Sequence, residues 1–499
     1  MHDANSNARI RPMPASPIQP AMWLNLFSRQ ARPGLPLREQ LCAALRDAIA
    51  CGSLGQGERL PSTRVLAADL ALSRVTAEAA YTQLEAEGYL ERRVGHGTRV
   101  RAGLAAPETD AGGAGAPGLL PAPALSRRGQ ALLAGGACRD PRQPRAFDAG
   151  LPDLDAFPLA LWRQLTAHCL RRHGAALLGY GDPQGYLPLR TAIARYLAQS
   201  RGVRCDASRV VIVTSSQQAL VLLANLLLDP GDAVALEDPG YAGARTAFAA
   251  AGARLLPIPV DADGICVPDA AAGARLGYVT PSHQYPSGAT LALERRLALI
   301  EQARAGAAWL VEDDYDSEFQ YDARPVPAMQ GLDRHGRVIY LGTFSKVLFP
   351  SLRLAYMVLP PELVDAVVTA RTVHDGHCAQ LSQAVAAEFI ARGHFAAHIR
   401  QMRALYRSRR DLLLERLRQA GCAWLEPVAA AGGLQLAAYL PQGSEAALTR
   451  QAGALGLATP SLSRLYLGSH RRDGWLLGYA GLPNQQISAG VALLARLRP

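Results

Sequence analysis

Short apolar runs alternate with helix-like segments along the chain from Asp148 onward. Examples of the apolar runs are RVVIVT, DAVALED, RLGYVTP, AWLVEDD and RVIYLGTF. Segments rich in Ala, Leu and Arg separate these runs. The alternation predicts an α/β domain in which helices cover a mostly parallel sheet.

Residues 35–101 show a different pattern, that of short helices followed by a hairpin. An amphipathic helix ended by Gly52 comes first, and its apolar residues recur about one turn apart: Leu41, Leu45 and Ile49. A short helix through Leu70 follows, then a tight turn, and then a helix from Arg74 to Glu87. YLERRV and TRVR then predict two short strands around GHG. Together these elements predict a winged helix-turn-helix.

The chain therefore divides into four segments. Residues 1–34 are rich in Pro and polar residues, so we expect a partly disordered arm. The winged helix-turn-helix occupies 35–101. In residues 102–147 Gly, Ala and Pro dominate and no amphipathic period lasts, which predicts a linker. The α/β domain occupies 148–499.

Composition indicates a soluble globular protein. Apolar residues make up 49% of the 499 and charged residues 19%. No run reaches the roughly 18 apolar residues of a membrane span, and the first 30 residues hold no signal-like core, so we expect a cytoplasmic protein. None of the eight cysteines stands at metal-ligand spacing, so we expect free thiols and no metal site.

The charge of the chain is compatible with a nucleic-acid partner but does not establish one. The net charge is +10, yet residues 35–101 hold nine Arg against eight Asp and Glu. Any DNA contact must therefore come from where individual arginines are placed, because the bulk charge of this segment is small. The N-terminus of the second helix of the helix-turn-helix motif presents Ser73, Arg74 and Thr76, where a major groove can reach them. The alternative is a small helical packing domain with solvated arginines.

The segment LPSTRVLAADLALSRVTAEAAYTQLEAEGYLERRVGHGTRV resembles the sequence pattern of the GntR-type winged helix family along almost its whole length. This resemblance implies operator DNA as a partner. It places five residues at DNA-contacting positions: Arg64, Ser73, Arg74, Thr76 and Gly95.

Lys346 is the only lysine of the chain, against 51 arginines. A guanidinium stays charged at any physiological pH and cannot form a Schiff base, whereas an amine can lose its proton and react. Lys346 also follows an apolar strand, an unlikely place for a solvated lysine. These features favour a chemical role over the alternative of one surface lysine retained by chance.

Other residues near strand ends suggest an aldehyde cofactor with a phosphate. Ser215, Ser216 and Gln217 lie where a strand runs into a helix, whose exposed N–H groups can bind phosphate. Thr343, Ser345 and Arg353 surround the lysine in the sequence.

Two further strand ends carry candidate ring contacts. Asp313 could pair with a pyridinium nitrogen, with Tyr315 beside it, or both could belong to a solvated acidic loop. Tyr241 could stack on a ring or pack against the sheet edge.

Together these elements resemble the fold-type I pyridoxal 5'-phosphate (PLP) aminotransferase family over about residues 148–499. The resemblance implies that Lys346 forms an internal aldimine, that Asp313 holds the pyridine nitrogen and that Tyr315 bonds the ring hydroxyl. Tyr241 would stack on the ring, and the residues around the phosphate would be Ser215, Ser216, Gln217, Thr343, Ser345 and Arg353. Tyr180 resembles the tyrosine that reaches a neighbouring subunit's phosphate, which implies a homodimer.

A winged helix, a linker and an aminotransferase-like domain in one chain resemble the MocR/GabR family of bacterial regulators. That layout implies a transcription regulator that senses PLP or a PLP-reactive amine, with at most weak or partial transamination. One alternative is an active aminotransferase with an accessory DNA-binding domain. Another is a repressor with a vestigial, cofactor-free domain.

The sequence departs from catalytic aminotransferases at two places. Tyr285 stands where they carry an asparagine that contacts the cofactor, and His283 or Gln284 could substitute for it. Leu476 stands where they carry the arginine that clamps the substrate carboxylate, although Arg471 and Arg472 lie nearby. The loss of this clamp favours a regulator and points towards PLP itself as the signal.

Overall fold

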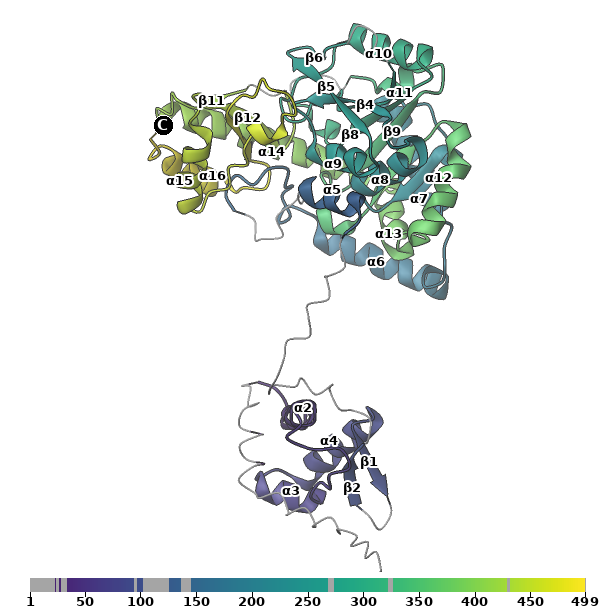
Figure 1. Cartoon of the computed structure of the whole chain (residues 1–499), viewed down its shortest axis with the longest axis vertical. Helices are drawn as coiled ribbons and strands as arrows, with labels where there is room; N and C mark the ends of the chain where they lie inside the picture. Colours follow the sequence, from purple (N-terminus) through teal and green to yellow (C-terminus); the bar gives the residue numbers. More distant parts are fainter. Residues whose placement is uncertain are drawn as a thin grey trace, which may run out of the picture. The chain divides into compact units, whose positions relative to one another are not determined.

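The computed structural model describes residues 23, 27, 34–93, 97–101, 125–135, 145–267, 273–321, 326–428 and 431–498. The chain forms two compact units, Met1–Ala122 and Pro123–Pro499 (Figure 1). The division between them falls inside the predicted linker. Among the described helices, none is both long and apolar enough to cross a membrane.

The first unit is a winged helix-turn-helix, as predicted. Its elements are α2 (Leu37–Ala50), α3 (Thr63–Asp69), α4 (Arg74–Ala86), β1 (Leu90–Arg93) and β2 (Gly97–Val100). Ser62 and Ser73 cap α3 and α4 by accepting from the N–H groups of Val65 and Thr76. The turn between the helices uses Ala71 at φ 53°. Strands β1 and β2 pair in antiparallel register, with Leu90 opposite Val100.

The apolar spacing of α2 is confirmed by its burial. Leu41, Leu45 and Ile49 face a core shared with Leu66 of α3 and Tyr81 of α4. Trp23 also packs in this core, within the segment that we expected to be a disordered arm. The remaining residues of that arm lie outside the described ranges, apart from Phe27 and Gly34.

An eight-stranded sheet organises the second unit, in the order β3-β10-β9-β8-β7-β4-β5-β6. Its strands are β3 (Val210–Val213), β4 (Ala233–Asp238), β5 (Arg254–Asp261), β6 (Gly264–Ile265), β7 (Ala274–Val279), β8 (Trp309–Asp314), β9 (Val338–Thr343) and β10 (Ala355–Val358). The five predicted strands are β3, β4, β7, β8 and β9. Pairings among β5, β4, β7, β8 and β9 are parallel, whereas β10 is antiparallel to both its neighbours.

Alternate residues of the strands pack in two different hydrophobic cores, each formed with its own set of helices. Figure 1 shows the helices around the sheet. In β3, Val211 and Val213 pack in one core and Val210 and Ile212 in the other. The first core includes residues of α8 (Ser216–Leu227), α9 (Ala242–Ala250) and α12 (Pro361–Asp375). The second includes residues of α6 (Leu159–His173), α7 (Leu187–Arg201), α13 (Gln380–Ala391) and α14 (His394–Gln419). Helices α10 (Leu293–Ala305) and α11 (Met329–Leu332) cover a third, smaller core.

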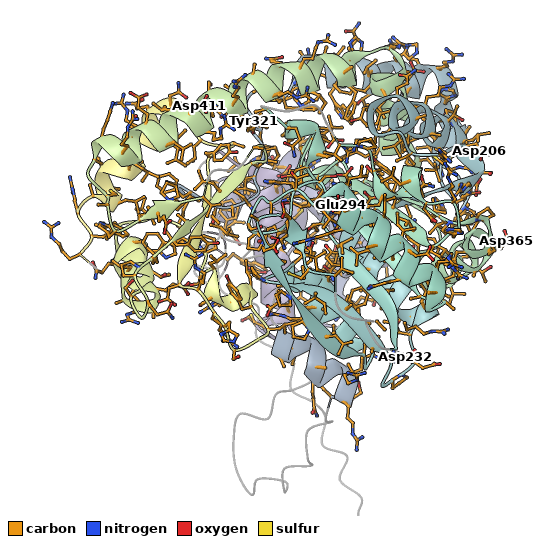
Figure 2. All side chains as sticks on the ribbon, turned by 90° about the horizontal axis from the view of Figure 1, so that it is seen from above. Asp206, Asp232, Glu294, Tyr321, Asp365 and Asp411 are labelled. Carbon is orange, nitrogen blue, oxygen red and sulfur yellow. The ribbon has the colours of Figure 1, made fainter. Side chains whose placement is uncertain are left out.

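A smaller antiparallel sheet lies in the C-terminal part of this unit. It consists of β11 (Glu426–Pro427), β12 (Gln435–Tyr439) and β13 (Gly474–Gly478), with helices α15 (Glu445–Ala454) and α16 (Asn484–Leu494). The arginines of α14 make specific contacts in this region. Arg409 pairs with Asp153 at 2.6 Å, and the Arg410 guanidinium lies 5.0 Å from the ring centre of Tyr321. Figure 2 shows Tyr321 and Asp411 together at this helix.

The segment predicted as a linker contains a helix, α5 (Arg127–Gly135), which lies against α9. The linker prediction did not include this helix. Among the residues of α5 whose burial is described, only Gly129 and Ala131 are partly buried, while Leu132 and Leu133 are exposed, as is Leu125 before the helix. The helix thus makes its contact through small residues.

We expect Arg201→Leu to destabilise the second unit by about 3–5 kcal/mol, because it leaves a buried carboxylate unpaired. Arg201 is 4% exposed, and its Nε donates to Asp314 at 2.8 Å. Denaturant midpoints would measure the loss. Arg195→Leu, on an exposed position of the same helix, should change the free energy of unfolding by less than about 0.5 kcal/mol. Equal effects of the two variants would contradict the assigned role.

Candidate functional site

A cavity of ≈ 870 Å³ opens at the carboxyl ends of the large sheet's strands. Ten of the eleven predicted cofactor residues line it: Ser215, Ser216, Gln217, Tyr241, Asp313, Tyr315, Thr343, Ser345, Lys346 and Arg353. They come from segments that lie far apart in the sequence and that end β3, β4, β8 and β9. The sheet therefore brings together the residues that the sequence singled out separately.

Lys346 follows β9 and is half-buried. Its Nζ donates to the carbonyl oxygen of Gly150 at 2.7 Å. Gly150 has φ +70°, and a Cβ at this position would lie 2.6 Å from Nζ. Only glycine therefore allows this approach of the amine. The sequence analysis missed Gly150, since neither its φ nor its contact with a lysine 196 positions away can be read from the sequence.

Asp313 ends β8 and is 3% exposed. One carboxylate oxygen, Oδ2, accepts from the Tyr278 hydroxyl at 2.8 Å, while Oδ1 has no hydrogen-bond partner. Burial raises the pKa of the carboxyl to about 7. Asp314 and Asp316 add to the rise, while the Tyr278 hydrogen bond and the Lys346 charge oppose it. A buried carboxylate with one oxygen unpaired is suited to a cationic N–H of a ligand.

The alternative of a solvated acidic loop around Asp313 is contradicted. Glu312, Asp314 and Asp316 are all buried. Each has its own partners: the N–H groups of Met329 and Gln330 for Glu312, Arg201 and Tyr340 for Asp314, and His283 for Asp316. These neighbours hold the end of β8 in place.

The N-terminus of α8 supplies one end of the cavity. Ser215 caps the helix by accepting from the Gln218 N–H at 3.1 Å. The Gln217 amide donates to the Gly243 carbonyl at 2.9 Å, which ties α8 to the start of α9. Arg353 has a left-handed backbone at φ 53° and lines the same cavity. A helix N-terminus beside an arginine is an arrangement that binds phosphate groups.

Three tyrosines surround the space beside Asp313. The Tyr285 ring lies edge-on to Tyr241 at 5.8 Å and to Tyr315 at 6.1 Å between ring centres. All three line the cavity, and Tyr241 also packs against a core of the sheet. The packing of Tyr241 against the sheet is therefore observed, while its stacking on a ligand ring stays a prediction.

Neither His283 nor Gln284 lines the cavity, so neither takes the position of the absent asparagine. His283 Nδ1 lies 3.0 Å from Asp316 and 3.1 Å from the Tyr315 hydroxyl. The Gln284 amide is engaged within its own turn and with Pro239. The residue that faces the cavity here is Tyr285 itself.

Leu476 is 1% exposed and packs with Ala437 and Leu462 away from the cavity lining. Arg471 and Arg472 do not line the cavity either, and Arg472 lies over the ring of Tyr439. Two arginines that the sequence analysis did not select, Arg145 and Arg464, do line it.

Tyr180 is the one predicted cofactor residue outside the cavity. Its side chain is fully exposed, and its ring lies edge-on to His377 at 5.9 Å. Its contact with a neighbouring subunit stays a prediction.

In the first unit, three of the predicted DNA-contacting residues lie at the N-terminus of α4, namely Ser73, Arg74 and Thr76, whereas Arg64 lies in α3. Arg64 and Arg74 are exposed, and Val75, the residue after Arg74, is 78% exposed. Ser73 and Thr76 bond to each other, with 2.8 Å between their hydroxyl oxygens, so part of their polarity serves the helix cap. Gly95 lies outside the described residues.

Two arginines of the hairpin are engaged in contacts within the first unit. Arg92 pairs with Glu78 at 2.6 Å and Glu85 at 3.3 Å, and Arg99 donates to the Gly57 carbonyl. These contacts anchor the wing to α4 and to the preceding loop. Arg93 and Arg101 remain exposed at its edge.

The chain joins a winged helix-turn-helix unit to an α/β unit whose sheet carries a lysine at its carboxyl edge. These features define a class of two-domain protein with a DNA-binding unit and an aminotransferase-like domain. The pattern of bacterial regulatory proteins of the gntR family matches residues 37–100, and that of aminotransferase class I and II matches 147–447. The chain belongs to the MocR type of GntR regulators, which are transcriptional regulators with an aminotransferase-like domain.

Similar proteins include both regulators and enzymes. The chain is 41% identical to the probable rhizopine catabolism regulatory protein MocR of Rhizobium meliloti, over 92% of each. It is 33% identical to the transcriptional regulator TauR of Rhodobacter capsulatus, over 92% of this chain and 96% of the relative.

Among solved structures, a kynurenine aminotransferase of Pyrococcus horikoshii in complex with PMP matches with a TM-score of 0.67 at 28% identity, over 75% of this chain and 94% of that one. LysN of Thermus thermophilus, complexed with N-(5'-phosphopyridoxyl)-L-leucine, matches with a TM-score of 0.65 at 31% identity, over 74% and 94%.

We expect Asp313→Asn to make the cofactor-free protein more stable relative to the unchanged protein as pH rises. The carboxyl has a pKa of about 7 when folded and about 3.9 when unfolded. The contribution of this carboxyl to the free energy of unfolding is complete at low pH, where it is protonated in both states. That contribution is lost as pH rises through 7. The stability gap between the two proteins should widen by roughly 2–3 kcal/mol from pH 5 to pH 8.

Denaturant midpoints across this pH range would measure the gap. Asp365→Asn, at an exposed position labelled in Figure 2, is the control and should show no widening. If the stability gap between Asp313→Asn and the unchanged protein stays constant with pH, burial does not raise the pKa of this carboxyl.

Proposed function

We propose that the protein is a PLP-dependent transcription regulator that senses PLP or a PLP-reactive amine through Lys346. The observation that carries the proposal is the meeting of the chain's single lysine and the half-paired carboxylate of Asp313 in one cavity. Oδ1 of Asp313 and Oδ1 of Asp314 are both buried without a hydrogen-bond partner, but only Asp313 lines the cavity. An unpaired carboxylate oxygen at this position fits a protonated ring nitrogen.

The residues present fit the cofactor at each of its polar groups. Asp313 would hold the ring nitrogen, Tyr315 the ring hydroxyl, and Tyr241 the ring face. The N-terminus of α8 would hold the phosphate together with Thr343, Ser345 and Arg353. When bound, PLP supplies an aldehyde and a ring that withdraws electrons. Lys346 supplies the amine for that aldehyde, and the Gly150 carbonyl orients this amine.

Binding at this site would control the DNA-binding unit by shifting populations of the whole protein. A ligand shifts such an equilibrium only as far as it binds the two states differently. We propose a homodimer in which Tyr180 of each chain reaches the other chain's phosphate, because its ring is fully exposed and lies outside its own chain's cavity. Two winged helices would then bind an operator in the bacterial cytoplasm.

A working aminotransferase is the second candidate, and the intact set of Lys346, Asp313 and Arg353 favours it. The position of Leu476 disfavours it, since a buried leucine there gives a substrate carboxylate no bidentate partner. At most weak or partial transamination is therefore expected. Turnover of an amino donor with a keto acid would separate the two candidates.

We expect Lys346→Arg to abolish covalent cofactor attachment while keeping the positive charge, because a guanidinium forms no Schiff base. The protein would be mixed with PLP, reduced with borohydride and mapped by peptide mass. The unchanged protein should carry the adduct on Lys346 only, and thermal unfolding would check that the variant folds. An adduct elsewhere, or none on the unchanged protein, would refute the proposal.

We expect Arg74→Ala to weaken binding of a DNA fragment selected with the unchanged protein by about 1–3 kcal/mol, with no change in cofactor absorbance. The physical reason is the loss of an exposed cation at the N-terminus of α4. Filter binding or fluorescence anisotropy at fixed salt would measure it. Arg38→Ala, an exposed position of α2, removes the same charge as a control. Equal losses for both variants would contradict a recognition role for α4.

A further inference from the structure

A buried histidine lies behind the cavity and has no part in the proposed function. His283 follows β7, is 5% exposed and does not line the cavity. Its ring packs against Gly433, which has φ +90°, and a Cβ at that position would overlap the ring. The Gly433 N–H donates to the Phe319 carbonyl at 3.0 Å. The backbone of a separate segment therefore fixes the place of this imidazole.

One nitrogen of the imidazole, Nδ1, contacts two residues of the cavity lining. The carboxylate oxygens of Asp316 lie 3.0 and 3.1 Å from Nδ1, and the Tyr315 hydroxyl oxygen lies 3.1 Å from it. Among the residues that the structure describes, neither the Asp316 carboxylate nor the Tyr315 hydroxyl has another hydrogen-bond partner. His283 therefore joins a buried carboxylate to a phenol at the cavity wall.

The partners of Nδ1 assign the direction of both hydrogen bonds. An ionised carboxylate only accepts, so Nδ1 carries a proton, and it does so in the neutral imidazole as well as in the imidazolium. A nitrogen that carries a proton cannot accept one, so the Tyr315 oxygen accepts from it. The other ring nitrogen, Nε2, is buried without a partner among the described residues, so the ring is oriented through Nδ1 alone.

The proton of the Tyr315 hydroxyl is thereby free to face the cavity. Its oxygen accepts from His283, and no described residue accepts its proton. Burial, with the charge of Asp316 adding to it, raises the pKa of this hydroxyl, so the hydroxyl stays protonated. A phenol proton at a cavity wall without an acceptor in the protein is available to an oxygen of a ligand.

We infer that His283 is a positioning residue that acts on the cofactor through Tyr315. The Asp316 carboxylate holds the Nδ1–H of His283, and this N–H holds the Tyr315 oxygen. The Tyr315 proton is thereby directed to the ring oxygen of PLP. The inference rests on the proposed function, since it assigns a second residue to the same cofactor site.

The absorbance of PLP bound to the full chain tests the inference through its pH midpoint. A donor to the ring oxygen stabilises the negative charge that remains when the bound cofactor loses its proton, so the donor lowers this midpoint. We expect His283→Leu to raise the midpoint by about 0.5–1 unit, because the Tyr315 proton then turns to the freed Asp316 carboxylate. His283→Asn should keep the midpoint, since its amide N–H takes the place of the Nδ1–H.

A second background shows whether the effect passes through Tyr315. In Tyr315→Phe, which has no hydroxyl, His283→Leu should cause less than half of the shift that it causes in the unchanged protein. Tyr340→Phe is the matched control, because it removes a 2.6 Å hydrogen bond to the neighbouring buried carboxylate of Asp314, outside the cavity lining. That variant should leave the midpoint unchanged.

The outcomes separate the inference from the proposed function. If the unchanged protein shows no cofactor absorbance with PLP, the proposed function fails. If absorbance is present, the inference is overturned when His283→Leu leaves the midpoint in place or shifts it by half as much or more in Tyr315→Phe. It is also overturned when His283→Asn or Tyr340→Phe shifts the midpoint as far as His283→Leu does.

Thermal unfolding checks that each variant folds. Should His283→Leu fail to fold, His283→Gln replaces it, because the longer side chain carries its amide to the Nε2 position and leaves no donor in place of Nδ1. The same rise of the midpoint is then expected, and an unchanged midpoint overturns the inference.

Discussion

The hydrogen bond between the Lys346 amine and the Gly150 carbonyl is the contact on which the site depends. It joins the end of β9 to the segment that enters the second unit, 196 positions earlier in the chain. The approach is so close that a methyl group on Gly150 would lie 2.6 Å from the amine nitrogen. The large sheet and the entering segment must therefore be folded together before this amine has a defined place.

Apart from Lys346, every Lys or Arg position of this chain is an arginine, so arginines make the structural hydrogen bonds and ion pairs that lysines share in most proteins. Arg296 and Arg371 are fully buried. Arg296 donates to the backbone carbonyls of Leu291, Pro281 and Pro327, and Arg371 donates to that of Ile212. A planar guanidinium with five donors suits such sites, and it keeps its charge there. In this chain the Lys346 amine thus differs chemically from the side-chain cation of every arginine.

Much of the fold was predictable from the sequence, because strand runs and cap residues are local signals. The strands around Asp313 and Lys346 could be read from apolar runs alone, and a carboxylate and an amine at strand ends already indicated a site. Gly150 and Tyr278 could not be found in this way. Their roles depend on a backbone angle and a buried hydroxyl, which arise only in the tertiary structure. Helix α5 was not predicted because Gly, Ala and Pro dominate the segment that contains it.

The single lysine gives the chain one site for a lysine-specific protease, which would divide it into residues 1–346 and 347–499. The bond after Lys346 is followed by Val347 and Leu348, which are 2% and 1% exposed. Cleavage therefore requires the segment after β9 to open locally. The rate at which the chain is cut in two reports directly on the opening of the site, without any label on the protein.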